Sequence, residues 1–199
     1  MVDYDYRERF KDYLGRIFYL AVLSRIELGV ITKKLSECYL LKEIERNNYS
    51  VIMNSTPEEM YTFIFGLEAK DNSFAKYNDA YWCGYVYAEI FYNSGRSFPY
   101  IFLMLPLDDL INKYDVYHEM DISQLIDYFQ KCEMKETILT RLIKKRKITT
   151  AELSKLSGVP LNTLNYYKKS NEYIYKANFS VIKRIAMVLD VDDRIFLKP

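Results

Sequence analysis

The sequence predicts an all-α protein in which an N-terminal helical domain, residues 1–130, precedes a five-helix domain, residues 131–199. Apolar residues recur every three or four positions through most of the chain, which is the spacing of a helix with one buried face. Residues that favour helix starts, such as Ser, Thr, Asp and Pro, stand before most of these stretches. The sign of the charge also changes near residue 130, and this indicates two units.

The two predicted domains differ in net charge. Residues 131–199 contain 15 Lys and Arg and 7 Asp and Glu, a net charge of +8. Residues 1–130 contain the other 13 basic and 20 acidic residues, a net charge of −7. A basic surface attracts polyanions and an acidic surface repels them, so we expect any nucleic acid to contact residues 131–199. The acidic domain is expected to serve dimerisation or to bind a protein partner.

Composition argues against several classes of protein. Half of the residues are apolar, so the chain can form a core. No apolar run approaches the roughly 20 residues of a membrane span, and the N-terminus lacks the apolar core of a signal peptide. The cysteines, Cys38, Cys83 and Cys132, are odd in number and far apart, which favours reduced thiols over disulfides or a zinc site. We expect a cytoplasmic protein without membrane association, metal or cofactor.

The first three helices of the N-terminal domain follow from apolar spacing and capping residues. The first should run from Tyr4 to Leu28 and end at Gly29, and the second should run from a cap at Thr32 to Arg46. Residues 54–59 combine a capping hydroxyl, a Pro in the first turn and a Glu three residues after the cap, which predicts a third start. This third helix should bury Met60, Phe63, Ile64 and Leu67.

Four more helices complete the predicted N-terminal domain. They are expected at residues 71–92, at residues 97–104, after Pro106 and at residues 121–130. The first of these is rich in aromatic residues, and Asn93, Ser94 and Gly95 should end it. The apolar stretch at residues 100–105 has no clear period, so a strand remains an alternative there.

In the basic domain, a helix from about Met134 to Lys147 should carry a run of cations at its C-terminal end. Two short helices should follow around a tight turn. A hydroxyl of Thr149 or Thr150 can cap the first of them. Its apolar face should consist of small and aliphatic side chains, those of Ala151, Leu153 and Leu156.

The turn between these two helices has a residue suited to each position. Gly158 can adopt a left-handed conformation without strain, and Pro160 can begin the next helix, where its missing N–H costs nothing. Val159 and Leu164 should point into one core. The second helix then leaves polar and basic side chains exposed, which is how a helix-turn-helix fills a major groove. Helices at residues 179–189 and 192–197 should close the domain.

The basic domain resembles the lambda-repressor-like (XRE) DNA-binding family over roughly residues 133–197. The resemblance rests on four motifs: Ala151–Leu153, Ser157–Val159, Thr163–Leu164 and Ile185–Val191. This sequence departs from the family pattern at Pro160, where the family usually has a capping Ser or Thr. Its loop at residues 170–178 is also a few residues longer than usual. Both departures concern the docking angle more than the fold.

The resemblance implies that the second helix of the motif contacts base edges. The positions it assigns to base reading are Leu161, Asn162, Asn165 and Tyr166. An Asn amide can form two hydrogen bonds with adenine, and a Leu can contact a thymine methyl group. The residues expected to hold phosphates are Lys145, Arg146, Thr150, Lys168 and Lys169. The alternative is that this helix is only the solvated face of a protein-binding domain.

Few residues suggest an enzyme. His118 is the only histidine, and a metal site usually needs a second His or Cys at helical spacing. Acid–base chemistry by His118 with Glu119 is conceivable, but a structural hydrogen bond to a cap or a neighbouring Tyr is the expected role. The chain has no Gly-rich phosphate loop, and its paired carboxylates stand at helix starts, where the helix dipole accounts for them. We therefore expect a protein that is not an enzyme.

The sequence favours a transcriptional regulator that binds a specific double-stranded operator. One such domain contacts only a half-site, so we expect a homodimer on a palindromic operator, with repression by steric exclusion of polymerase. The alternative is an antitoxin or phage-type inhibitor. In that case residues 1–130 would neutralise a protein partner while the basic domain autoregulates the operon.

Overall fold

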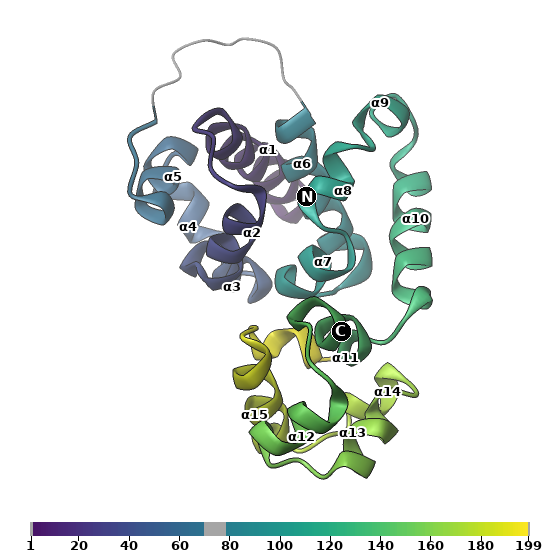
Figure 1. The fold of residues 1–199 in the computed structure, drawn as a ribbon. Coiled ribbons are helices and arrows are strands. Elements are labelled where there is room, and N and C mark those ends of the chain that lie inside the picture. Colours follow the sequence, from purple (N-terminus) through teal and green to yellow (C-terminus); the bar gives the residue numbers. More distant parts are fainter. Residues whose placement is uncertain (1, 70–78, 199) are drawn as a thin grey trace. The chain divides into compact units, whose positions relative to one another are not determined.

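The computed structural model describes residues 2–69 and 79–198, and the chain divides into two compact units, Met1–Tyr128 and Phe129–Pro199. Every regular element in the described ranges is a helix, and none is a strand (Figure 1). The all-α prediction is therefore confirmed, and the strand alternative at residues 100–105 is wrong. The division between the units falls inside helix α10 (Ile122–Lys135), so one helix runs across it.

The N-terminal unit consists of short helices around one long one. Its helices are α1 (Val2–Leu23), α2 (Leu28–Glu37), α3 (Tyr39–Glu45), α4 (Ser50–Met53), α5 (Pro57–Phe65), α6 (Asp79–Ser94), α7 (Phe98–Met104), α8 (Leu107–Ile111), α9 (Tyr114–Tyr117) and the first part of α10. The helix expected at residues 71–92 is α6. Its first residues, 71–78, lie outside the described part, and Gly95, with φ of 64°, follows its end as predicted.

Two expected helix boundaries are wrong in this unit. Helix α1 ends at Leu23, because Arg25 takes a left-handed conformation and the Ile26 N–H bonds the Ala21 carbonyl at 3.2 Å. Gly29, the expected stop, lies in the first turn of α2. The helix expected at residues 32–46 is two helices, because Cys38 between them is extended, with φ of −70° and ψ of 155°.

Helices α1 and α6 pack along each other and form the centre of the N-terminal unit (Figure 1). The inward face of α1 is apolar as predicted, with Phe10, Leu14 and Ile17 fully buried. The two backbones approach closely at Gly15 and Gly84, where a Cβ on Gly84 would lie 2.7 Å from the Gly15 Cα. Only glycine allows this separation, so the two glycines fix where α1 and α6 cross.

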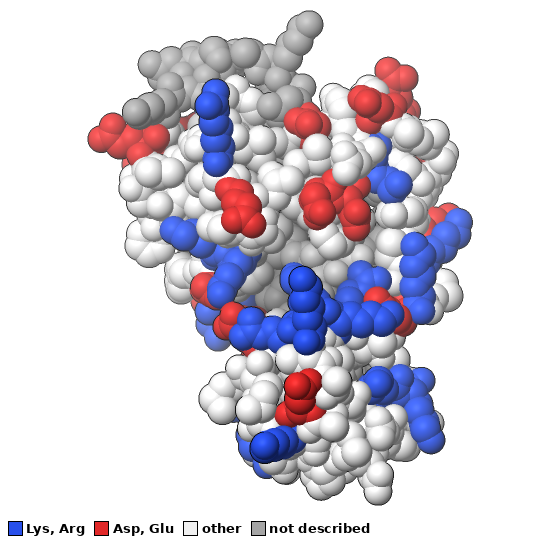
Figure 2. Space-filling model, viewed as in Figure 1, with Lys and Arg blue, Asp and Glu red and all other residues white. Residues whose placement is uncertain are grey.

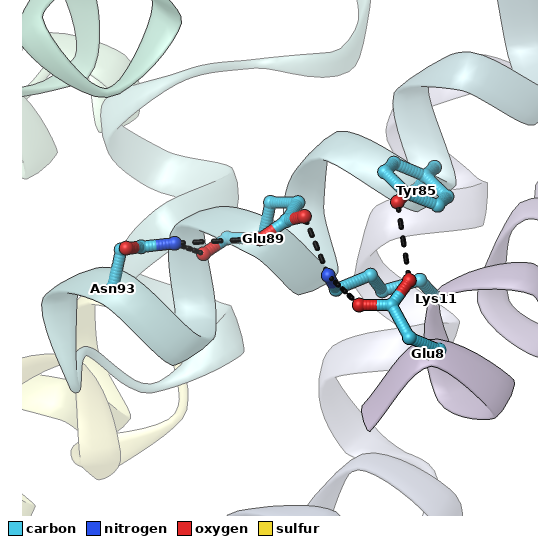
Figure 3. Close-up of polar contacts among 5 residues, drawn as sticks. All are labelled: Glu8, Lys11, Tyr85, Glu89 and Asn93. Carbon is cyan, nitrogen blue, oxygen red and sulfur yellow. Dashed lines mark hydrogen bonds and ion pairs between the residues drawn. The ribbon is translucent and has the colours of Figure 1, made fainter. Parts of the chain in front are cut away.

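A polar network also joins these two helices (Figure 3). The buried Lys11 ammonium of α1 lies 2.6 Å from a Glu8 carboxylate oxygen and 2.5 Å from one of Glu89 on α6. The Tyr85 hydroxyl donates to the other Glu8 oxygen at 3.4 Å, and the Asn93 amide donates to the Glu89 carbonyl at 2.8 Å. The buried cation therefore has two carboxylate partners, which a charge in a protein interior requires.

Helix α5 begins as predicted and faces the core with different residues. Thr56 accepts a hydrogen bond from the Glu59 N–H while the Glu59 carboxylate accepts one from the Thr56 N–H, a capping box. Of the four side chains expected inside, Met60 is buried, but Phe63 is 74% and Leu67 45% exposed. Tyr61 is buried instead, and its hydroxyl donates to Ser24 at 2.6 Å. Packing against α1 thus sets the rotation of α5.

The C-terminal unit begins with the last turns of α10 and contains five further α-helices and a short 3-10 helix in the described residues. They are α11 (Ile138–Arg146), α12 (Thr150–Ser157), α13 (Leu161–Tyr167), α14 (Asn171–Ile174), α15 (Phe179–Leu189) and η1 (Asp193–Phe196). The first begins four residues later than expected, because the Thr137 hydroxyl caps it by accepting the Thr140 N–H. Helix α14 lies in the predicted loop, and the expected last helix is the 3-10 helix.

Candidate DNA-binding surface

The helix-turn-helix consists of α12 and α13 with residues 158–160 between them. Helix α12 starts with a capping box in which Thr149 accepts the Glu152 N–H at 3.1 Å and Glu152 accepts the Thr149 N–H at 2.7 Å. This backbone hydrogen bond from Thr149 lowers the pKa of Glu152 below its usual value. Gly158 then has φ of 66° and closes the helix, as the sequence predicts.

The turn is held by hydrogen bonds from two serines. The Ser154 hydroxyl donates to the Val159 carbonyl at 2.7 Å, and the Ser157 hydroxyl accepts the Val159 N–H at 3.3 Å. Val159 and Leu164 are buried as predicted. Ala151 and Leu156, expected on the inward face of α12, are exposed, because that face consists of Leu153 and Ser157, one turn apart.

Helix α13 exposes all four residues to which base reading was assigned. Leu161, Asn162, Asn165 and Tyr166 lie on one side, whereas Leu164 and Tyr167 on the opposite side are buried. At 100° per residue the four exposed positions span a single helix face. Pro160 precedes the helix and supplies no side-chain cap, so the departure from the family pattern leaves the first N–H groups of α13 without that cap. Pro160 and Leu161 are both exposed, so this end of α13 lies at the surface.

The expected phosphate-binding residues fall into two groups. Thr150, at the start of α12, accepts a hydrogen bond of 3.0 Å from the Lys168 ammonium, which lies at the end of α13 beside the exposed Lys169. Lys145 and Arg146 lie elsewhere, at the C-terminal end of α11. The Arg146 guanidinium is 3.8 Å from the Asp190 carboxylate, so a phosphate there would compete with an exposed ion pair.

Within the C-terminal unit, Lys and Arg side chains lie over α11 on the face drawn in Figure 2, and within the N-terminal unit Asp and Glu side chains lie near α8 and α9. At the end of α11 the run Lys144, Lys145, Arg146 and Lys147 is exposed. Exposed cations of this kind attract phosphates over a distance of about 10 Å at moderate salt.

Sequence reasoning missed Tyr173 and Lys176. Tyr173 belongs to α14, and its ring stacks on Tyr166 with centroids 4.0 Å apart and planes inclined by 15°. Both lie in an open pocket of about 460 Å³ whose lining residues are Asn162, Thr163, Tyr166, Tyr167, Tyr173 and Lys176. A capping residue in the sequence could have predicted α14. Ser170 stands before Asn171 and Glu172, and its hydroxyl accepts the Glu172 N–H and caps the helix.

His118 has partners of its own on α9. Its Nδ1 lies 2.8 Å from the Tyr114 carbonyl oxygen, and its ring stacks on Tyr114 at 4.4 Å. Its Nε2 is 3.6 Å from a Glu119 oxygen. In the described part of the chain, no group of three or more His, Cys, Asp and Glu could hold a metal ion. Among the same residues, no helix is both long and apolar enough to cross a membrane.

Known proteins provide one further observation. Residues 139–192 match the family model of the Cro/C1-type HTH DNA-binding domain. No curated protein and no solved structure matches the chain. The matched residues begin within α11 and extend past α15, so they include the whole helix-turn-helix. Residues 139–192 are thus a Cro/C1-type helix-turn-helix DNA-binding domain, as the resemblance to the lambda-repressor-like family predicts.

Proposed function

We propose that the protein is a transcriptional regulator that binds a specific double-stranded operator and represses promoters, including that of its own gene. The observation that carries this proposal is the exposed face of α13 within the Cro/C1-type domain. Four side chains with different hydrogen-bonding and apolar character stand there, and cations lie at the end of the same helix. A regulator must reach promoter DNA, so we also propose a cytoplasmic location.

Each side chain of this face has a matching group in the major groove. Asn162 and Asn165 can each bond the N6 and N7 edge of an adenine, and Leu161 can contact a thymine methyl group. A good bidentate pair discriminates against the wrong base by about 1–3 kcal/mol. Lys168, held by Thr150, and Lys169 can bond the phosphates on either side of the groove. These phosphate contacts orient the domain but carry no sequence information.

Dimerisation is part of the proposal because one helix-turn-helix contacts only a half-site. Two copies related by a two-fold axis would contact a palindromic operator whose half-sites are about one helical turn, roughly 34 Å, apart. We assign dimerisation to the acidic N-terminal unit, because its net charge of −7 disfavours contact with DNA. Occupancy of a promoter by such a dimer would exclude polymerase.

A second candidate is an antitoxin or phage-type inhibitor in which the N-terminal unit binds another protein. The exposed apolar side chains of that unit favour it, because Phe63 on α5 is 74% exposed and Leu67, just after the end of this helix, is 45% exposed. Large exposed apolar side chains often belong to a protein-binding surface. In this case the DNA-binding domain would still regulate the operon.

A mobility-shift experiment tests the proposal. The full chain is mixed with the duplex upstream of its own gene at two salt concentrations, with a random duplex as competitor. We expect a complex that survives the competitor and weakens as salt rises, because phosphate contacts release counterions. A complex that the competitor removes at both salt concentrations would contradict sequence-specific binding. A pull-down with the N-terminal unit as bait would then test the second candidate.

A further inference from the structure

We infer that Tyr173 is a specificity-determining residue that acts by positioning Tyr166 on the recognition helix. The inference rests on the proposed function, because it assumes that α13 contacts base edges. It adds α14 to the proposed DNA-binding surface, because Tyr173 belongs to this helix and not to the helix-turn-helix. The juxtaposition that carries it is the parallel stack of the two rings, 4.0 Å between centroids.

Helix α14 is short, but it is fixed to its surroundings at both ends. Its first residue, Asn171, accepts a hydrogen bond of 2.9 Å from the Ile138 N–H at the start of α11. Its last residue, Ile174, is fully buried. Tyr173 stands between these two anchors, so its ring is presented from an element that cannot rotate freely. A stack on such a ring limits the motion of its partner.

Tyr166 needs a restraint of this kind. It is 47% exposed on the face of α13 that also carries Asn162 and Asn165. An exposed side chain of this size populates several rotamers, and DNA binding would have to select one of them at an entropic cost. The Tyr173 ring selects that rotamer before DNA arrives. The Tyr166 hydroxyl is then held in place relative to the two Asn amides.

The open pocket next to the stack adds a second consequence. Tyr166 and Tyr173 contribute to its lining together with Asn162 and Lys176. Removing the Tyr173 ring would widen the pocket on the α14 side and let Tyr166 turn into the space. Such a turn would move Tyr166 away from the base edges while leaving the phosphate-binding cations of α13 in place. Specific binding should therefore weaken more than non-specific binding.

The test compares affinities of the full chain for two duplexes. One duplex is selected by the parent protein from a random pool, and the other is a scrambled duplex of the same composition. Tyr173→Ala should lower the ratio of the two affinities by about three- to tenfold, the range expected for one aromatic pair. Affinity for the scrambled duplex and the salt dependence should not change. Tyr173→Phe, which keeps the ring, should preserve the parental ratio.

A double-mutant cycle shows whether Tyr173 acts through Tyr166. Tyr166→Ala combined with Tyr173→Ala should be no worse than Tyr166→Ala alone. Tyr39→Ala is the control for Tyr166→Ala, because Tyr39 of the N-terminal unit is 56% exposed and Tyr166 is 47% exposed. It should leave the ratio of the two affinities unchanged. If thermal unfolding shows that Tyr173→Ala is not folded, Tyr173→Leu replaces it, with the same expected loss.

The outcomes separate this inference from the proposed function. If a folded Tyr173→Ala or Tyr173→Leu variant keeps the parental ratio of affinities for the two duplexes, Tyr173 does not have the inferred role. The proposed function would still stand. Additive losses in the double variant would also overturn it, because two independent contacts would then be at work. A parent protein that selects no sequence from the pool would instead contradict the proposed function itself.

Discussion

The charged side chain of Lys11 is buried in the N-terminal unit, and only 7% of the residue is exposed. Burial alone would lower the pKa of this ammonium, but the hydrogen bonds with Glu8 and Glu89 outweigh burial and raise the pKa. Lys11→Met should therefore destabilise the chain by about 3 kcal/mol, because it leaves the Glu89 carboxylate, itself largely buried, without its cation. Denaturant unfolding of both proteins measures this difference.

The control for Lys11 is Lys34→Met, which removes an exposed ammonium from the same unit. A surface substitution of this kind should change the unfolding free energy by about 0.5 kcal/mol or less. Equal stability of the Lys11→Met variant and the parent would mean that the network in Figure 3 contributes little to the packing of α1 on α6.

Lys169 is exposed at the end of α13, where we propose that it contacts a phosphate. Lys169→Ala should weaken binding to all duplexes by a similar factor, because phosphates are the same in every sequence. The slope of log affinity against log salt should also fall by about one, the value for one lost phosphate contact. Titrations at four salt concentrations measure it. Lys34→Ala, at an exposed lysine of the N-terminal unit, is the matched control. An unchanged slope of log affinity against log salt in Lys169→Ala would mean that Lys169 does not contact the DNA.

At the scale of elements, the crossing of α1 and α6 depends on Gly84. A Cβ there would lie 2.6 Å from the Leu14 carbonyl oxygen and 2.7 Å from the Gly15 Cα, both of them backbone atoms that cannot move separately. Gly84→Ala should cost about 1–3 kcal/mol, the usual range for overpacking a core. Gly29→Ala in α2 is the control, because its Cβ meets only a Glu27 oxygen at 3.6 Å. Thermal unfolding of the two variants should differ clearly, and equal melting temperatures would contradict the close crossing.

Local chemistry explains which elements the sequence could predict. The starts of α5 and α12 depend on capping residues within three positions, and Thr56 and Thr149 serve as caps in the folded chain. Gly158 and Val159 have their predicted roles because a tight turn restricts conformation and size. Asn162 and Asn165 are exposed because they are polar residues beside the buried Leu164, whereas the exposure of Leu161 was implied only by the family resemblance.

Other features depend on contacts between distant residues, and the sequence could not predict them. Phe63 and Tyr61 are both apolar enough to be buried, and packing against α1 decides that Tyr61 is inside. The extended Cys38 divides an otherwise continuous helical pattern. Tyr173 comes next to Tyr166 only because α14 folds back on α13, which apolar spacing within one helix cannot reveal.

For the whole molecule, buried tyrosines determine how stability depends on pH. Burial raises the pKa of Tyr13, Tyr85 and Tyr87 above the usual 10.0, and the pKa of Lys11 is raised above 10.5. Groups whose folded pKa is raised contribute stability that is complete below the unfolded pKa and is lost as pH rises. Burial also raises the pKa of the Cys83 thiol above its usual 9.0. The free energy of unfolding should therefore begin to fall near pH 9, as this thiol ionises in the unfolded chain, and fall further above about pH 10 as the tyrosines and Lys11 follow.

Denaturant unfolding between pH 8 and 11 measures this loss. Tyr87→Phe should be less stable at neutral pH, because the Tyr87 hydroxyl donates to the Leu105 carbonyl at 2.9 Å, but should lose less stability above pH 10. A pH profile identical to that of the parent would show that Tyr87 is not protected from ionisation in the folded state.

Selection from a random duplex pool shows whether the exposed face of α13 determines which sequence is bound. The full chain and its Asn162→Ala variant are each used to select duplexes, with Asn112→Ala, an exposed Asn of the N-terminal unit, as control. We predict that Asn162→Ala loses preference at one base pair of each half-site and keeps it elsewhere, because one bidentate contact is removed. Selection profiles that are identical for all three proteins would contradict base reading by α13.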